Sequence, residues 1–284
     1  MTVSRANILI TGAGGMLGGY ANFGIHTTHE SLDVQNIQSI RATCAEHRPS
    51  VIFHLAAATD LVECEKNPEK AYRANAVGTY NVALVAREVG AKLVYVSTSA
   101  VFDGKKIESY REDDIPNPQN HYGHSKYLGE LAVTGLLSDY IIARTCWIFG
   151  GGPTKDHKFV ANILKQLTKP SVEIIGGKRG SPTYGKDFVE ACLRLVEEGK
   201  RGIFHVGNEG APTRVDIARE IVRIVGTPTE VIETDASVFE KQYPGTGARG
   251  NESIVSTKVI LRPWREALRE YIETEWSSVV QKTV

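Results

Sequence analysis

Tyr122 and Lys126 lie four residues apart in the segment Tyr122-Gly-His-Ser-Lys126. We expect a helix to begin just after Asn120-His121, and on a helix this spacing puts the phenol and the ammonium on one face. A nearby ammonium favours the ionised form of a phenol, so such a tyrosine can pass a proton to a carbonyl oxygen. The same spacing also fits a surface tyrosine beside a solvated lysine. Taken alone, the pair therefore does not establish a catalytic site.

A cluster of hydroxyl side chains, Ser97-Thr98-Ser99, favours the catalytic interpretation. It follows the apolar run Lys92–Val96, which has the length and β-branched content of a strand. In an open parallel sheet, ligands bind beyond the carboxyl ends of the strands. A hydroxyl at that position can hydrogen-bond the same carbonyl that the phenol protonates.

Three glycines near the start of the chain predict a dinucleotide site. Gly12, Gly15 and Gly18 follow the strand predicted at Asn7–Thr11 with the spacing Gly-x-x-Gly-x-x-Gly. Such glycines allow a tight turn and a close approach of the backbone to a pyrophosphate at a helix N-terminus. A glycine-rich turn without a ligand is the alternative, but the position directly after the first strand favours cofactor binding.

The residues expected near the cofactor's adenosine ribose do not identify the cofactor. A second strand at Ile25–Thr28 would end beside His29 and Glu30. An acidic residue there favours a free 2′-hydroxyl and a basic one a 2′-phosphate, and this pair fits neither clearly. His29 fits an exposed loop equally well. The small residues Ala56-Ala57-Ala58 fit either close approach of a flat ligand or tight helix packing.

Strand-like and helix-like segments alternate along the chain, which predicts an α/β fold with a doubly wound parallel sheet of the Rossmann type. Further strands are predicted at Val51–Leu55, Tyr140–Arg144 and Ile203–Val206. Helices are predicted at Ile37–His47, Pro68–Val89, Tyr122–Leu137, Tyr184–Glu198, Phe159–Lys169 and Val215–Val225, with a last one from Trp264. A short strand is expected near Glu230–Glu233. Only about two helical turns fit between Gly18 and Ile25, so the first helix should be truncated.

The glycine-rich segment after Trp147 predicts that the chain leaves the sheet there and returns later. We expect a dinucleotide-binding domain at residues 1–149, with 184–206 returning to it. A smaller α/β substrate lobe should comprise residues 150–183 and 207–284. This lobe would include a glycine-rich loop at Pro244–Gly250.

Composition excludes several other classes of protein. Thirty-three basic and thirty-three acidic residues give no net charge that would draw the chain to nucleic acid or to an anionic membrane. No apolar run approaches the length of a membrane span, and the first residues lack the pattern of a secretory leader, so we expect a cytoplasmic protein. The four cysteines lack metal-site spacing, so no metal is expected and buried free thiols are favoured.

In this pattern the chain resembles the extended short-chain dehydrogenase/reductase family, and within it the dTDP-4-dehydrorhamnose reductases, over nearly its whole length. The resemblance rests on segments spread over both predicted lobes. They are Leu32-Asp33, Ala56-Ala57-Ala58, Asn75-Ala76, Ser97-Thr98, Val101-Phe102-Asp103-Gly104, Tyr122–Lys126, Gly129-Glu130, Arg144–Trp147, Gly180–Thr183, Asp187, Ala248-Arg249, Ser253 and Thr257-Lys258. It implies reduction of a 4-keto group on a nucleoside-diphosphate deoxysugar by NADPH or NADH. A homodimer is one option for the assembly, and the sequence does not fix the oligomeric state.

The resemblance also implies residue roles. Thr98, Tyr122 and Lys126 would be catalytic, and Asn75 would support the proton path of the lysine. The cofactor-binding residues would be Gly12, Gly15, Met16, Leu17, Gly18, His29, Asp33, Ala56, Ala57, Ala58 and Asn75, together with Tyr122 and Lys126. The substrate would meet Thr98, Ala100, Trp147 and Arg249. Trp147 also fits a core position, and Arg249 a surface charge.

Several departures leave the particular sugar open. Ser99-Ala100 replaces the usual Asp-Tyr, Gly177-Lys178 replaces Asp-Gln, and His29 stands where an arginine is usual. A sugar-nucleotide 4-epimerase with the same tyrosine and lysine is one alternative. A dinucleotide-binding regulatory subunit without turnover is another, because the regulatory subunit of methionine adenosyltransferase resembles these reductases.

Overall fold

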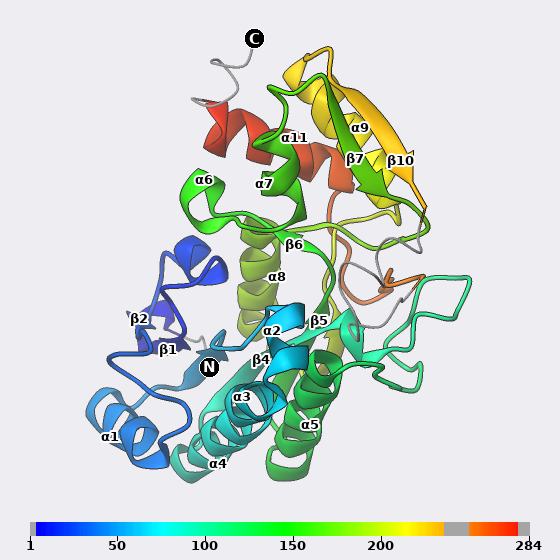
Figure 1. Ribbon diagram of the computed structural model, residues 1–284. Helices are drawn as coiled ribbons and strands as arrows, with labels where there is room; N and C mark the ends of the chain where they lie inside the picture. The colour runs from blue at the N-terminus through cyan, green and yellow to red at the C-terminus, as the bar shows by residue number, and fades with distance from the viewer. Residues whose placement is uncertain (1–3, 236–249, 278–284) are drawn as a thin grey trace.

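The computed structural model describes residues 4–235 and 250–277 (Figure 1). Its largest element is a six-stranded sheet with the order β2-β1-β3-β4-β5-β9. Every neighbouring pair is parallel, which confirms the predicted fold class. The strands are β1 (Ile8–Thr11), β2 (Ile25–His26), β3 (Val51–His54), β4 (Lys92–Thr98), β5 (Tyr140–Thr145) and β9 (Gly202–His205).

The strand order reverses at β1. From β1 the chain runs outward to β2 on one side, and then crosses to β3, β4 and β5 on the other. The connections on the two sides of such a strand diverge, which leaves a crevice beyond the carboxyl ends of β1 and β3. The topology therefore positions a ligand site directly over the glycine turn.

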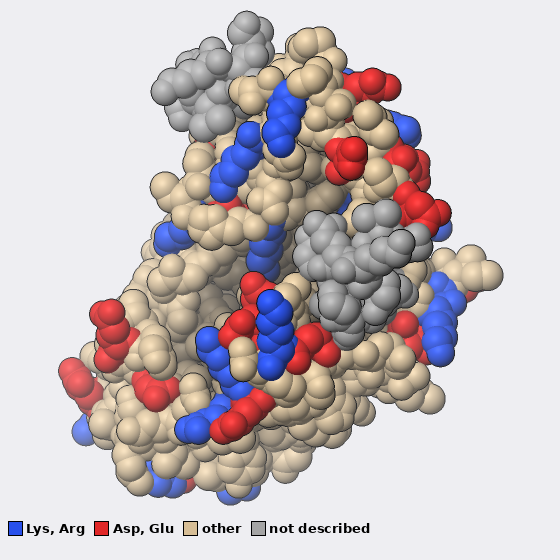
Figure 2. Space-filling model, in the orientation of Figure 1, with Lys and Arg blue, Asp and Glu red and all other residues tan. Residues whose placement is uncertain are grey.

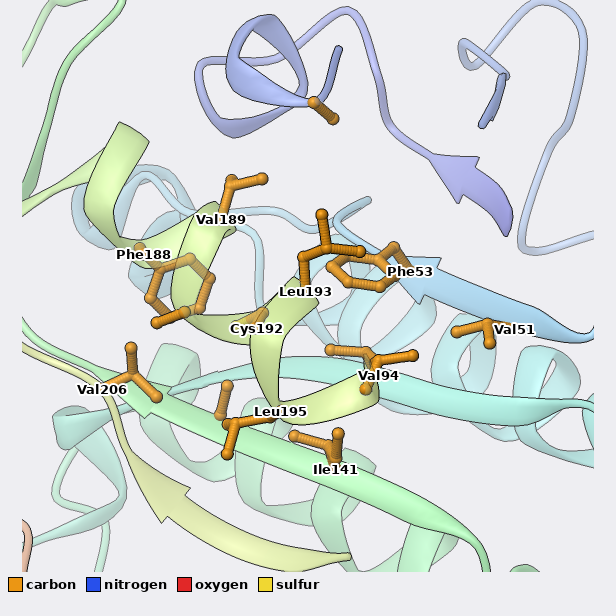
Figure 3. Packing of buried hydrophobic residues seen from close by; sticks show 14 of the residues in the cluster. Val51, Phe53, Val94, Ile141, Phe188, Val189, Cys192, Leu193, Leu195 and Val206 are labelled. Atoms are coloured by element: carbon orange, nitrogen blue, oxygen red, sulfur yellow. The ribbon is translucent and has the colours of Figure 1, made fainter. Parts of the chain in front are cut away.

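Successive residues of each strand point to opposite faces of the sheet, and both faces are buried. Leu9, Ile52 and Leu93 pack against α1 (Ile37–His47), α4 (Gly78–Val89) and α5 (His121–Leu136). Their neighbours Ile10, Phe53 and Val94 point the other way and pack against α8 (Gly185–Glu197). Figure 3 shows Phe188, Val189, Cys192, Leu193 and Leu195 of α8 among the strand side chains Phe53, Val94 and Ile141.

Helix α8 covers a face that the first crossover leaves open. The expected truncation is confirmed, because only one 3₁₀ turn, η2 (Leu17–Tyr20), follows the glycine segment. Tyr20 in this turn packs against Gly185 at the start of α8, where a Cβ atom would lie 2.7 Å from the tyrosine ring. The chain thus returns to the sheet through α8 and then adds β9 beside β5.

The upper part of Figure 1, which we call the second lobe, has its own core. Strands β7 (Ser171–Ile175) and β10 (Glu230–Thr234) form a parallel pair against α9 (Arg214–Val225). The remaining elements there are β6 (Ile148–Phe149), α6 (Gly152–Lys155), α7 (Phe159–Leu164), β8 (Thr183–Tyr184) and α11 (Trp264–Glu275). Among the described residues, no helix is long and apolar enough to cross a membrane.

Two predictions for helices need correction. The helix expected at Phe159–Lys169 ends at Leu164, because the Thr229 hydroxyl binds the carbonyls of Leu167 and Lys169 and holds that segment in turns before β7. Strand β7 itself was not predicted. The helix expected at Pro68–Val89 is divided into α3 (Pro68–Tyr72), a π-helical turn at Arg73–Val77 and α4. A short α2 (Leu61–Lys66) precedes it.

Candidate active site

The glycine turn lies against the end of β3. Gly12 has a left-handed backbone (φ 69°), and a Cβ atom there would lie 2.6 Å from the backbone nitrogen of Ala56. The Gly15 N–H donates to the Gly12 carbonyl at 3.0 Å, which closes the turn, and a Cβ on Gly18 would overlap the backbone of Ala13. The turn and the alanine segment therefore meet over the crevice that the strand order creates.

The two apolar residues of the turn have different surroundings. Met16 precedes η2, and its Cγ atom would lie 3.4 Å from a Cβ on Gly151 in the second lobe. Leu17 is partly buried against the sheet core. Met16 thus faces the second lobe, whereas Leu17 also anchors the turn to the sheet.

Asn75 joins the alanine segment to the helix that carries Tyr122 and Lys126. It is fully buried in the π-helical turn. Its Oδ1 accepts from the Ala58 N–H at 2.8 Å, and its Nδ2 donates to the Ala58 carbonyl at 2.9 Å and to Ser125 Oγ at 3.0 Å. Such π-turns occur often at functional sites, because the extra residue redirects side chains. Here the turn aims an amide between β3 and α5.

The first turn of α5 lies against the end of β4. The Asn120 side chain caps this helix by accepting from the Gly123 N–H at 2.8 Å. A Cβ on Gly123 would overlap the carbonyl of Ala100, so glycine permits the close approach. Thr98 Oγ1 accepts from the Ala100 N–H at 3.1 Å. These contacts bring Tyr122 and the hydroxyl of Thr98 to the same corner of the molecule.

Lys126 is buried, with only 3% of its surface exposed. Its ammonium lies 4.2 Å from the centre of the Tyr95 ring, and the Tyr95 hydroxyl donates to the Lys126 carbonyl at 3.1 Å. Burial lowers the pKa of Lys126 to about 7, while the Glu130 carboxylate opposes this shift. The lysine is thus held at a ring face, with a charge that is sensitive to its surroundings.

A chain of buried hydrogen bonds runs beneath this corner from β1 to the π-turn. His54 Nδ1 lies 2.8 Å from Thr11 Oγ1, and His54 Nε2 lies 3.1 Å from Thr79 Oγ1. The Thr79 hydroxyl donates to the Asn75 carbonyl at 2.6 Å, so it accepts from a proton on His54 Nε2. Burial, with a smaller effect of the Lys126 charge, lowers the pKa of His54 to about 3. His54 is therefore a neutral structural link.

The loop after β2, where we expect the adenosine of the cofactor, is exposed to solvent. The end of β2 lies beside the glycine turn, because the Ala13 N–H donates to the Thr27 carbonyl at 2.9 Å. The side chain of His29 is 80% exposed and lies 3.9 Å from Asp33 Oδ1. Both interpretations of His29, as a ribose contact or as an exposed loop residue, stay open.

The predicted substrate residues fall in three different settings. Trp147 is partly exposed in a left-handed backbone (φ 42°), and its Nε1 donates to Glu252 at 3.2 Å. Its ring packs on Gly180, and the Arg214 guanidinium lies 5.2 Å from the ring. Ala100 is buried against α5. Arg249 lies outside the described residues.

Figure 2 shows the surface hollowed between the sheet and the second lobe, with basic and acidic side chains along the rim. Sequence reasoning gave no role to Tyr95, His54 or the buried pair Glu130 and Arg144, although all four belong to this corner. One signal was available: Arg144 is a charged residue within the apolar run Tyr140–Cys146. A cation in a buried strand requires a partner.

The reversed strand order, the glycine turn and the Tyr–Lys helix together define an extended short-chain dehydrogenase/reductase fold. Comparison with known proteins then gives the family: residues 6–276 match the RmlD substrate binding domain, and the chain belongs to this family. The resemblance inferred from the sequence is confirmed.

Relatives match nearly the whole chain. The spore coat polysaccharide biosynthesis protein SpsK of Bacillus subtilis is 35% identical, over 95% of this chain and 98% of that protein. A dTDP-4-dehydrorhamnose reductase of Mycolicibacterium smegmatis is 32% identical, over 96% and 86%. The crystal structure of dTDP-4-dehydrorhamnose reductase from Bacillus anthracis in complex with NADP has a TM-score of 0.87, with 30% identity over 94% of this chain and 99% of that one.

Proposed function

We propose that this protein reduces the 4-keto group of a nucleoside-diphosphate-linked deoxysugar, consuming one NADPH or NADH per product. The observation that carries the proposal is the corner described above, in which Asn75, Thr98, Tyr122 and Lys126 converge beside the glycine turn. Membership of a family that includes dTDP-4-dehydrorhamnose reductases supports the same reaction.

In this proposal the reduced dinucleotide supplies the hydride, and the chain's own residues manage the proton. Tyr122 donates its phenolic proton to the keto oxygen as negative charge develops there. Thr98 Oγ1 accepts a backbone N–H, so its own hydrogen can be donated to the same oxygen. Lys126 stabilises the phenolate that remains, and Asn75 with Ser125 holds the helix that carries both.

The dinucleotide would lie along the turn of Gly12, Gly15 and Gly18 and past Ala56, Ala57 and Ala58. Met16 and Leu17 continue this surface, and Lys126 would also hold the nicotinamide ribose. His29 and Asp33 stand at the adenosine end. Because His29 and Glu30, at the end of the second strand, give neither a clearly basic nor a clearly acidic environment, we expect modest discrimination between the two cofactors.

For the substrate, we propose packing of the sugar or its nucleotide on Trp147 and pairing of a phosphate with Arg249. Ala100 stands where the family usually has a tyrosine, so one sugar contact is missing. This difference should shift the preference among 4-keto sugars without changing the chemistry.

The proposal also includes the domain bounds, the assembly and the location of the protein. The dinucleotide-binding domain would comprise residues 1–149 and 184–206, and the substrate lobe the rest. The protein would work as a homodimer in the cytoplasm.

The test is a panel of nucleotide-linked 4-keto sugars and the matching free keto sugars, assayed with NADPH and NADH. We expect turnover only with the nucleotide-linked forms, because binding of the remote nucleotide positions the sugar for hydride transfer. Equal rates on a free keto sugar would exclude the proposed role of Arg249. Dinucleotide binding without turnover on any sugar would favour the regulatory subunit.

A further inference from the structure

A buried ion pair lies one helical turn beyond Lys126. Glu130 and Arg144 are each only 2% exposed. Arg144 Nε donates to Glu130 Oε1 at 2.9 Å, and Arg144 Nη2 donates to Glu130 Oε2 at 2.7 Å. The Ser97 hydroxyl donates to the same Glu130 carboxylate at 2.5 Å. The pair therefore joins α5, β4 and β5 directly beneath the proposed catalytic residues.

Stability alone does not explain such a pair. Two charges removed from water lose their hydration, and replacing a buried pair with apolar residues is often neutral or stabilising. The position of this buried ion pair points to a functional role, because its neighbours adjoin the proposed catalytic residues. Ser97 adjoins Thr98 along β4, and Glu130 follows Lys126 by four residues, which is the spacing of side chains that interact on a helix.

We propose that Glu130 and Arg144 act together as positioning residues that set the electrostatic environment of Lys126 and Tyr122. The inference rests on the proposed roles of those two residues in the reaction. Glu130 supplies a negative charge that favours the ammonium, and Arg144 limits this effect by pairing with the carboxylate. The balance between the two charges sets the pH range in which the Tyr–Lys pair works.

Among the described residues, Tyr95 and His54 also interact with Lys126, and both are neutral. Burial raises the pKa of Tyr95 well above its ordinary value, so the ring beneath the ammonium carries no charge. His54 on β3 is kept neutral by burial, as described above. Asn75 and Ser125 carry no charge. Glu130 is the charged side chain that raises the pKa of Lys126.

The sign of the expected effect is the same whether Lys126 or Tyr122 loses the proton. Removing the negative charge of Glu130 destabilises an ammonium and stabilises a phenolate, so it lowers both pKa values. Removing the positive charge of Arg144 does the opposite. Removing both charges should leave the apparent pKa near its original value.

Arg144 also has partners outside the pair. Its guanidinium lies 5.2 Å from the Phe102 ring, and its Nη1 donates to the Glu112 carbonyl at 3.4 Å. Glu130→Gln keeps the size of the side chain and one carbonyl acceptor for Arg144. This variant is therefore expected to fold with the arginine still in place.

The experiment measures the pH dependence of kcat, and of the Kd for NADPH, in Glu130→Gln, Arg144→Met, the double variant and Arg144→Lys. Glu130→Gln should move the basic limb of the kcat profile to lower pH by about one unit, and Arg144→Met should move it to higher pH by about the same. The double variant should return to within about 0.3 unit of wild type. Arg144→Lys keeps the charge and serves as the matched control, with no shift expected.

Circular dichroism and NADPH binding show which variants fold. If Arg144→Met does not fold, because Glu130 is then buried without a partner, the pH profiles of Glu130→Gln and the double variant still test the inference. Profiles that keep the wild-type pKa while the rate falls would overturn the inference, because they indicate a purely structural pair. A Tyr122→Phe variant that keeps its turnover would instead refute the proposed function, so the two failures are distinguishable.

Discussion

The corner around Lys126 and the loop around His29, where we expect the adenosine of the cofactor, are held very differently. Lys126 is 3% exposed and Asn75 is fully buried, with hydrogen bonds to two other segments. The side chain of His29 is 80% exposed, and its Nδ1 lies 3.9 Å from Asp33 Oδ1. A residue at the buried corner cannot change without disturbing its partners, whereas one at the exposed end can. We infer that the chemistry depends on the first region and that cofactor preference is adjusted at the second.

The largest effect is expected from Tyr122→Phe. Loss of the phenolic hydroxyl removes the proposed acid but little of the cofactor surface. Turnover should fall by at least about a hundredfold, in the range usual for general acid catalysis, while the Kd for NADPH changes only a few-fold. Steady-state assays and fluorescence titration measure the two quantities. A variant that retains more than about a tenth of the wild-type rate is incompatible with this role.

Lys126→Met should weaken both turnover and dinucleotide binding, and it also makes a prediction about stability. The pKa of Lys126 is about 7 in the folded protein, against about 10.4 for an unperturbed lysine. Below pH 7 both states hold the proton, so the folded protein bears the full cost of the buried ammonium. Between these values the folded state releases the proton first, and wild-type stability rises with pH.

We therefore expect the difference in melting temperature, Lys126→Met minus wild type, to be more positive at pH 6 than at pH 9. Thermal unfolding at the two pH values measures this difference. The same difference at both values would mean that Lys126 is not desolvated as described.

Gly12→Ala tests the close contact that forms the cofactor turn. A side chain would be strained at φ 69° and would lie 2.6 Å from the Ala56 nitrogen, so dinucleotide affinity should fall by more than about tenfold. Gly90→Ala is the matched control, since Gly90 has φ 70° and nothing within 4 Å of its Cβ position. Gly90→Ala should lose a similar amount of folding stability through backbone strain, but it should keep its affinity for the dinucleotide. Equal affinities in both variants would argue against binding at the turn.

The smallest effect is expected at the exposed end. His29→Ala should change the ratio of kcat/KM for NADPH and NADH only a few-fold. A preference above about a hundredfold that His29→Ala does not alter would contradict the modest discrimination expected from the sequence.

Sequence patterns predicted the parts of the fold that local chemistry determines. Helix Ile37–His47 and the strands of the sheet follow from periodicity and β-branched runs, and Gly12–Gly18 from its spacing after a strand. The π-turn at Arg73–Val77 was not predictable in this way. It depends on Gly129 of another helix, where a Cβ would lie 2.9 Å from the Asn75 carbonyl.

In the second lobe, too, features that depend on contacts between distant parts of the chain could not be predicted from the sequence. The left-handed backbone of Trp147 has no local signal, because it depends on packing against Gly180. The contact of Tyr20 with Glu275, at 2.7 Å, joins residues 255 positions apart. Roles could be proposed for single residues where a motif repeats a known chemistry, as in Tyr122 and Lys126, and these roles stay predictions. The pairing of Glu130 with Arg144, to which we assign a positioning role, became apparent only in the structure, although the charge of Arg144 within an apolar run was a signal that it needs a partner.

The most direct test of the proposed reaction uses NADPH carrying deuterium at the transferred position of the nicotinamide, with a dTDP-linked 4-keto-6-deoxy sugar. Absorbance follows the cofactor, and mass and NMR spectra follow the sugar. A reductase places one deuterium on the carbon that bore the keto group for every cofactor oxidised, and this is the result we predict. A rearranged sugar formed without deuterium and without cofactor consumption would contradict it and indicate an epimerase.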